Sequence, residues 1–155
     1  MELRSNAFQA GGAIPTEYTC SGAGISPPLA WTGAPENTVT LALIVEDPDA
    51  PGGTFTHWVL YDLPASVHDL PKAVRPEERL SNGGEQGMNS FGRIGYGAPC
   101  PPPGSPPHRY VFTLYAADVA INVPPRPEGN TVLGALQGHI IAQARLEGTY
   151  ARQGR

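Results

Sequence analysis

Charged side chains are scarce in this chain, and lysine is nearly absent. Only 15% of the 155 residues are charged, the net charge is −4, and Lys72 is the single lysine. A protein that binds nucleic acid by neutralising phosphates needs a basic patch, so nucleic acid is excluded as an expected partner. Because charge is rare, a local cluster of it is informative.

Long apolar segments are missing too. No run approaches the roughly 18 residues that a membrane-spanning helix needs, so no membrane span is expected. The N-terminal stretch MELRSNAFQAGG lacks the apolar core of a secretory signal. A cytoplasmic location is therefore the expectation.

Cysteine occurs only twice, at Cys20 and Cys100. Their spacing matches no metal-binding motif, and no cofactor is predicted. In a reducing cytoplasm, two small buried thiols are the favoured interpretation and a disulfide is less expected. The distance between the two residues in space decides between these alternatives.

Glycine and proline, in contrast, are abundant, with 19 and 18 residues. They interrupt short apolar runs, a pattern typical of all-β sandwiches and barrels. The length suits a single domain, residues 1–155, with a real core. The predicted fold class is mainly β: an antiparallel two-sheet β-sandwich with short peripheral helices and a C-terminal helix.

Hydrophobic periodicity locates the predicted elements. TVTLALIVE (38–46) is the strongest strand signal, and its nearly continuous apolar character predicts burial on both faces. TVLGALQGHIIAQA (131–144) has apolar residues at helical spacing after a Thr131 cap, which predicts an amphipathic helix. The other predicted elements are strands at 56–63, 108–118 and 145–152, an edge strand within 1–15, and a helical turn at 76–80.

Polar side chains gather where the strong strands meet loops. Asp47 and Asp49 follow the first strand, His57 begins the second, and His108, Arg109 and Tyr110 begin the third. In an antiparallel sheet the end of one strand lies near the start of its partner. We therefore expect a pocket at the rim of the sheet, walled by Phe55 or Trp58 and by loop prolines.

Four stretches resemble the phosphatidylethanolamine-binding protein family, also called Raf kinase inhibitor-like proteins, and specifically its bacterial and archaeal branch. The resemblance spans nearly the whole chain in family order. It implies a β-sandwich with a small pocket for phosphate or phosphoryl groups, and no enzymatic activity. The stretches are YTCSGAGISPPLAW (18–31), LALIVEDPDAPGGTFTHWVLYDLP (41–64), GYGAPCPPPGSPPHRYVFTLYA (95–116) and GHIIAQARLEGTYAR (138–152).

Carried over residue by residue, the resemblance implies a set of ligand-binding positions. Gly97 matches a loop glycine whose backbone N–H faces the anion. Two positions near the mouth depart from the family pattern: Gly24 replaces a polar residue and Ala98 a glycine. The turn and the resemblance also raise the expectation of a cis peptide at Ala50–Pro51. The expected ligand-binding residues are Asp47, Asp49, Pro51, His57, Gly97, His108 and Tyr110.

A phosphate beside carboxylates needs compensating protons or cations. Histidine supplies them near neutral pH, so His57 and His108 are expected to donate to the anion, at least one as imidazolium. Asp47 or Asp49 then holds a ring tautomer or is itself protonated. Tyr110 O–H and Gly97 N–H add neutral donors. Arg109 alternates to the other face and is expected outside the cluster.

Other interpretations of the same residues stay open at this point. A metal-dependent or hydrolytic enzyme could use Asp47, His57 and His108, although Ser105, the nearest nucleophile, lacks the G-x-S-x-G motif. The resemblance also implies protein kinases or proteases as partners and a homodimer. Aromatic and methionine side chains in the long loop could anchor that dimer: Met88, Phe91 and Tyr96.

Overall fold

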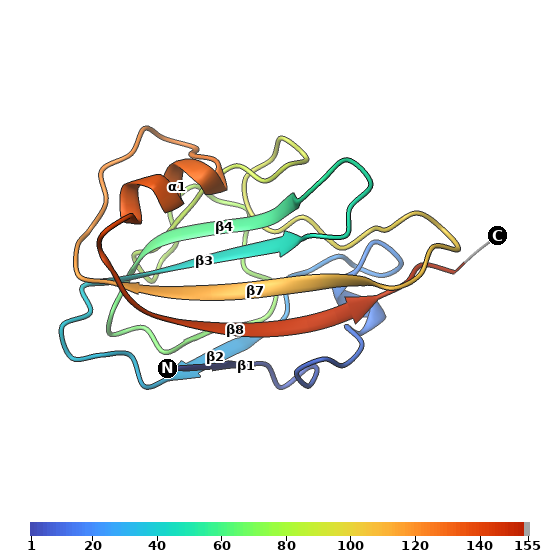
Figure 1. Ribbon diagram of the computed structural model, residues 1–155, viewed down its shortest axis with the longest axis horizontal. Helices are drawn as coiled ribbons and strands as arrows, with labels where there is room; N and C mark the ends of the chain where they lie inside the picture. The colour runs from blue at the N-terminus through green and yellow to red at the C-terminus, as the bar shows by residue number, and fades with distance from the viewer. Residues whose placement is uncertain (154–155) are drawn as a thin grey trace.

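The computed structural model describes residues 1–153, which form two antiparallel sheets packed face to face. The small sheet has the order β1-β2-β5, and the large sheet the order β6-β4-β3-β7-β8. Figure 1 shows the long strands of the large sheet side by side, with β1 and β2 in a separate layer. The strands are β1 (Glu2–Arg4), β2 (Leu29–Thr32), β3 (Thr40–Asp47), β4 (Phe55–Pro64), β5 (Asp69–Leu70), β6 (Glu85–Gln86), β7 (His108–Ala117) and β8 (Ile140–Tyr150).

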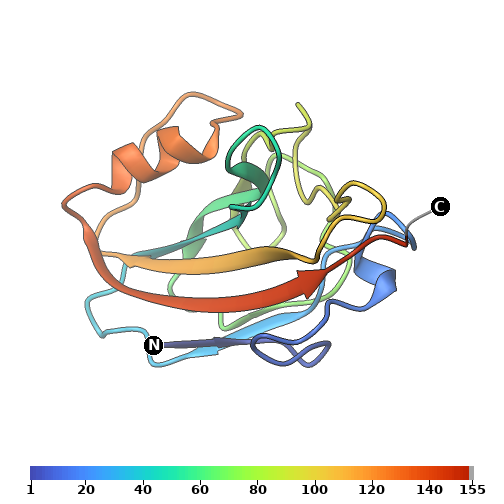
Figure 2. The same cartoon turned by 45° about the vertical axis from the view of Figure 1, so that its right-hand side comes forward.

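The predicted mainly β two-sheet architecture is therefore confirmed. The strand β3 is buried on both faces, as its continuous apolar run predicts. Leu41, Leu43 and Val45 join the core between the sheets, whereas Ala42 and Ile44 face the opposite side. There they pack beneath the helix α1 (Gly129–Leu136), which Figure 2 shows above the large sheet, with the small sheet below it.

The predicted helix over 131–144 is wrong in its second half. The helix α1 ends at Leu136, and Gly138 follows with φ of +83°, a left-handed conformation that commonly terminates helices. Residues from Ile140 onward then pair with β7, Ala142 opposite Ala116 and Ala144 opposite Leu114. The helix thus precedes the last strand and is not C-terminal. It is capped at Glu128, not Thr131, with no side-chain cap bond.

Residues 76–80 do not form the predicted helical turn. The buried side chain of Gln86 donates to the carbonyl oxygens of Arg75 and Glu77, at 2.7 and 2.8 Å. The Gln86 N–H also donates to Glu78 O at 2.8 Å. These bonds hold the segment beside β6, where Arg79 forms an isolated antiparallel bridge with Glu85.

Cys20 and Cys100 form a disulfide, contrary to the expectation of two buried thiols. Their Cα atoms lie 5.3 Å apart, and both residues are exposed. The proline-rich loop before β7 folds back onto the loop after the 3₁₀ turn Thr16–Tyr18, where the Cys20 N–H donates to Pro99 O at 3.0 Å. This approach of two loops 80 residues apart is a tertiary feature that no local spacing reveals.

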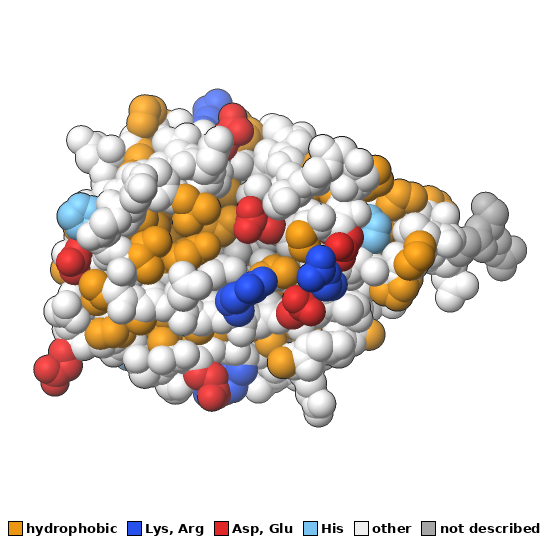
Figure 3. All heavy atoms as spheres, in the orientation of Figure 1, with side chains coloured by type: hydrophobic (Ala, Val, Ile, Leu, Met, Phe, Trp, Pro, Cys, Tyr) orange, Lys and Arg blue, Asp and Glu red, His pale blue; other side chains and the backbone are white. Residues whose placement is uncertain are grey.

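Within residues 1–153, no helix is both long and apolar enough to cross a membrane. Figure 3 shows charged side chains as scattered spots on the face it presents, without a broad basic patch there. This agrees with the low charge content of the chain.

Candidate anion-binding site

A small cavity lies at the rim of the large sheet, where β3 ends and β4 and β7 begin. Its volume is about 220 Å³. The structure brings together Asp47, His57, His108 and Tyr110, the four side chains expected to meet there. The remaining lining residues are Ala50, Pro51, Phe55, Phe91, Cys100, Pro101 and Pro102.

Strand register places the first two of these side chains. Asp47 is paired with Phe55, and Glu46 with Thr56, but Val45 is paired with Trp58. His57 is therefore the extra residue of a β-bulge, a device that redirects side chains near functional sites. As a result, His57 contributes to the cavity while the next residue, Trp58, is fully buried in the core.

Alternation along β7 places the other two. Tyr110, Phe112 and Leu114 all belong to the core between the sheets, and residues two apart in a strand share a face. His108, the first residue of β7, lies on the same face of the strand. Its ring stacks on that of Tyr110, with the ring centroids 6.5 Å apart. The cavity is therefore the polar end of the core face.

Asp47 and His108 form a buried pair in the lining of this cavity. His108 Nδ1 lies 2.7 Å from Asp47 Oδ2, and the two side chains are only 9% and 5% exposed. Because a carboxylate accepts, Nδ1 carries the hydrogen and Nε2 is left for another partner. The second oxygen of Asp47 accepts the Asp49 N–H at 2.8 Å, which ties the pair to the β3–β4 turn.

His57 is oriented by the loop that contains Gly97. Its Nδ1 donates to Gly97 O at 2.6 Å, so Nε2 is again the free ring nitrogen. Burial lowers the pKa of His57, more than the Gly97 carbonyl and Asp47 raise it. This favours the neutral ring at neutral pH, and in that form Nε2 is an acceptor. His57 can therefore donate to an anion, as expected from the sequence, only when its ring takes up a proton on binding.

Gly97 does not have the predicted role. Its N–H donates to His57 O at 2.7 Å and so does not face an anion. Its carbonyl, and not its N–H, is the group that acts on the site, by fixing the His57 tautomer. A glycine is required there because a Cβ would lie 2.4 Å from the Phe91 ring.

Tyr110 carries the most informative atom of the cavity. Its hydroxyl is one of two buried side-chain oxygens without a hydrogen-bond partner in residues 1–153, the other being Thr38 Oγ1 beyond the far end of β3. Burial, followed by the charge of Asp47, raises the pKa of Tyr110, so the hydroxyl stays protonated at neutral pH. It is an unused donor beside the two free histidine nitrogens.

Asp49 lies outside the cavity lining, contrary to its expected place among the ligand-binding residues. Its carboxylate binds Arg109 through both oxygens, with Nε and Nη2 at 3.0 and 2.9 Å, and also accepts the Arg109 N–H at 2.8 Å. The Arg109 side chain is the largest cause that lowers the pKa of Asp49 to about 2. The pair clamps the β3–β4 turn onto the start of β7. Arg109 is also outside the cavity, as alternation predicts.

Pro51 lines the cavity, but the Ala50–Pro51 peptide is trans, since no peptide in the described chain is cis. Gly53 N–H donates to Ala50 O at 3.1 Å, and Gly53 has φ of +107°. The reversal therefore uses Pro51 early in a tight turn and glycine freedom at its end, which needs no cis bond.

The aromatic and disulfide parts of the wall were missed or misassigned from sequence. Of the two aromatic residues expected in the wall, Phe55 lines the cavity. Trp58 instead lies in the core and donates to Gln86 Oε1 at 2.7 Å. Phe91, expected at a dimer contact, packs edge-on against His57 with ring centroids 5.6 Å apart. Its position in a glycine-rich loop offered no local signal. Cys100 enters the wall through the disulfide loop.

The structure adds no observation that favours the alternative of a metal-dependent or hydrolytic enzyme. Within residues 1–153, no three His, Cys, Asp or Glu side chains are arranged so that they could hold a metal ion. Ser105 does not line the cavity, and its hydroxyl donates to Pro102 O at 2.9 Å.

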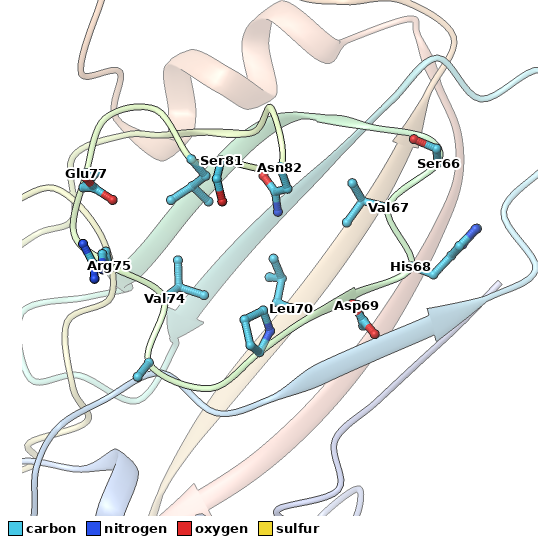
Figure 4. Close-up of a pocket in the computed structure, with 13 residues that line it drawn as sticks. Ser66, Val67, His68, Asp69, Leu70, Val74, Arg75, Glu77, Ser81 and Asn82 are labelled. Atoms are coloured by element: carbon cyan, nitrogen blue, oxygen red, sulfur yellow. The ribbon is translucent and has the colours of Figure 1, made fainter.

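A larger cavity of about 600 Å³ lies elsewhere, between β5 and the segment that ends at Asn82. Figure 4 shows the apolar side chains of Val67, Leu70 and Val74 among the residues that line it. It contains none of the residues expected at the ligand site and neither of the buried unpartnered oxygens of the described chain. Size alone therefore does not make it the better candidate.

The sequence of residues 4–151 matches the family described as phosphatidylethanolamine-binding protein. The chain belongs to this family. A UPF0098 protein from Methanothermobacter thermautotrophicus is 45% identical over 152 residues, which cover 98% of this chain and 99% of that protein. The bacterial and archaeal resemblance is thereby confirmed.

Two solved structures extend the comparison. The crystal structure of E. coli YbcL, described as a new member of the mammalian PEBP family, superposes with a TM-score of 0.90 at 35% identity, covering 98% of both chains. Carboxypeptidase Y inhibitor, solved in complex with its cognate proteinase, has a TM-score of 0.52 at 21% identity, covering 92% of this chain and 76% of that one. The latter likeness shows the shared fold alone.

Proposed function

We propose that this protein binds a small anion or the phosphoryl group of a larger ligand in the rim cavity. The observation that carries the proposal is the buried Tyr110 hydroxyl without a partner. An unsatisfied buried polar group costs about 1–3 kcal/mol, and an accepting oxygen of a ligand would remove that cost. Phosphate offers several such oxygens to the three groups that converge there.

The two histidines complete the donor set, and each is oriented through Nδ1. His57 bonds to Gly97 O and His108 to Asp47, so both Nε2 atoms are the ring positions left for a ligand. A protonated Nε2 donates to a phosphate oxygen, and a neutral Nε2 accepts from a phosphate O–H. Either arrangement places one proton between ring and anion.

Charge balance requires this proton. Among the described residues that line the cavity, Asp47 is the only carboxylate, and His57 and His108 are the only groups that can become cationic. With both rings neutral the cavity carries one negative charge and repels an anion. One proton on His108 makes its pair with Asp47 neutral, and a second on His57 makes the cavity positive. Anion binding is therefore coupled to proton uptake, and affinity should rise as pH falls.

The remaining expected residues support the site indirectly in this proposal. Asp47 orients His108, Pro51 shapes the wall, and Gly97 orients His57. Asp49 holds the β3–β4 turn through Arg109. Both Gly24 and Ala98, which depart from the family pattern, line a neighbouring cavity and leave these groups untouched.

A phosphoryl-binding pocket on a small single-domain fold suits a regulatory module. We keep protein kinases and proteases as proposed partners and a homodimer as the proposed assembly, the latter checked by mass measurement in solution at micromolar concentration. A cytoplasmic location also stays a prediction. The Cys20–Cys100 disulfide weighs against it, because disulfides persist mainly in oxidising compartments.

Replacing Tyr110 by phenylalanine tests the proposal, because it removes only the unpartnered hydroxyl. Calorimetric titration of inorganic phosphate and phosphorylethanolamine should show affinity about tenfold weaker or more, since a hydrogen bond to a charged partner contributes about 1.5–3 kcal/mol. The unliganded protein should not lose stability, because no bond is lost. Tyr115→Phe, on the opposite face of β7, is the matched control and should bind like the parent. Equal affinity of the Tyr110 variant and the parent would contradict the proposal.

A further inference from the structure

A second cavity adjoins the anion-binding cavity and shares two of its wall residues, Phe91 and Cys100. It is larger, about 500 Å³, and apolar residues such as Ile94, Tyr96 and Ala98 line much of it. The Phe91 ring stands at the boundary, with its centroid 5.6 Å from that of His57 on one side. Phe91 as a residue is 42% exposed, which leaves room for a ligand to pass over its side chain.

The loop that carries Phe91 is held rigidly beside the anion cavity. Asn89 is 4% exposed, and its Oδ1 accepts the N–H groups of Phe91 and Arg93 while Nδ2 donates to Gly95 O. Ser90 exchanges two further bonds with Thr56, the residue before His57, at 2.8 and 2.9 Å. The backbone at Phe91 and Arg93 is thus held in a defined position relative to His57.

Arg93 is the polar group that this second cavity leaves free. No carboxylate of residues 1–153 forms an ion pair with it, and its Cζ lies 6.0 Å from the Phe91 ring centroid. The other side-chain donors of the lining are engaged: Tyr96 donates to Tyr18 O at 2.7 Å, and Asn89 holds the loop. An uncompensated guanidinium above an exposed ring suits a flat ligand with a negative charge.

We propose that the second cavity binds the substituent of a phosphorylated ligand whose phosphoryl group occupies the rim cavity. The ligand class is an aryl phosphate with a second anionic group: its flat apolar body lies against Phe91, and its second charge reaches Arg93. This rests on the proposed phosphoryl binding and adds which phosphorylated compounds the site selects.

Three probes separate the contributions: inorganic phosphate, phenyl phosphate and 4-carboxyphenyl phosphate, titrated at low ionic strength. Phenyl phosphate should bind tighter than phosphate because it buries apolar surface on Phe91, and Phe91→Ala should remove that gain. The carboxylate should add up to about a fivefold gain, the size expected of an exposed ion pair. Arg93→Gln should remove this second gain and leave phosphate binding unchanged.

Arg145→Gln is the matched control, because Arg145 is exposed on β8 and pairs across the sheet with Thr113, away from both cavities. It should keep both gains. If phosphate binds but the three probes bind equally, or if Arg93→Gln keeps the carboxylate gain, the inference is wrong and the proposed function stands. If no probe binds the parent protein, the proposed function fails and this inference fails with it.

Discussion

Two aspartate–histidine pairs lie at opposite ends of β7. At its start His108 Nδ1 binds Asp47 at 2.7 Å, and after its end His139 Nδ1 binds Asp118 at 3.0 Å. The side chains of the first pair are 9% and 5% exposed, whereas those of the second are 48% and 42% exposed. The contact is the same, but only the first pair lies beside a cavity with an unused donor. Burial beside a cavity, and not the pairing itself, distinguishes the pair at the candidate site from the surface pair.

The largest expected difference between the two pairs is in the stability lost when the aspartate of each pair is removed. Asp47→Ala should lower the free energy of unfolding by about 3–5 kcal/mol, because it leaves a buried histidine and the Asp49 N–H without their acceptor. Asp118→Ala should cost at most about 1 kcal/mol, since exposed pairs contribute little. Urea denaturation of both variants measures the contrast, and similar losses would show that burial is not the deciding factor.

Removing each histidine should separate the pairs by binding. His108→Ala should weaken phosphate binding about tenfold or more, because one charge-assisted donor is lost. His139→Ala should bind phosphate like the parent protein. His139 lies after the opposite end of β7 and is not among the residues that line the cavity. Calorimetric titration gives both values, and a circular dichroism spectrum checks that the His108 variant is folded. Unchanged binding by that variant would place the anion elsewhere.

His57 should make stability depend on pH. Its pKa is lowered in the fold, so the unfolded chain takes up a proton near pH 6.5 while the folded protein does not. The stabilising contribution is full above about pH 6.5 and is lost as pH falls through the lower folded pKa. In His57→Gln, the fall in unfolding free energy between about pH 7.5 and 5.5 should be smaller than in the parent. His139→Gln serves as the control, and an unchanged slope in His57→Gln would contradict the assignment.

The smallest expected effect concerns the partly exposed Asp49–Arg109 clamp. The pKa of Asp49 is lowered to about 2, so its contribution is full above about pH 3.9, the unfolded value, and is lost as pH falls through about 2. Asp49→Asn should therefore reduce stability at neutral pH and flatten the acid limb of the unfolding curve. Phosphate affinity should change little, because Asp49 does not line the cavity. A large loss of phosphate affinity in this variant would instead indicate that Asp49 contributes to binding.

The sequence predicted those features of the fold and of the candidate site that follow from where the strands begin and end. Apolar runs located β3, β4 and β7, and antiparallel pairing of neighbouring strands predicted that Asp47 and His57 lie close together. That His108 joins them depends on β7 pairing with β3 from the same rim, which the structure shows. The end of the helix was missed although a local signal was present: periodicity continued through Gly138, whose left-handed backbone ended the helix. The other failures come from interactions that no local pattern encodes. Gly97 faced His57 and not the cavity because of a backbone bond across 40 residues, and the disulfide joined loops 80 residues apart.

The most direct test of the account is to measure whether a proton is taken up when the anion binds. Phosphate is titrated into the protein calorimetrically between about pH 8 and 6, in two buffers of different ionisation enthalpy, so that affinity and proton uptake are both obtained. Affinity should rise as pH falls through the histidine range and level off near pH 6, where phosphate itself takes up a proton. Net proton uptake should accompany binding at the higher pH. A flat affinity profile without proton uptake would contradict the account, because the histidines would then not balance the charge of the anion.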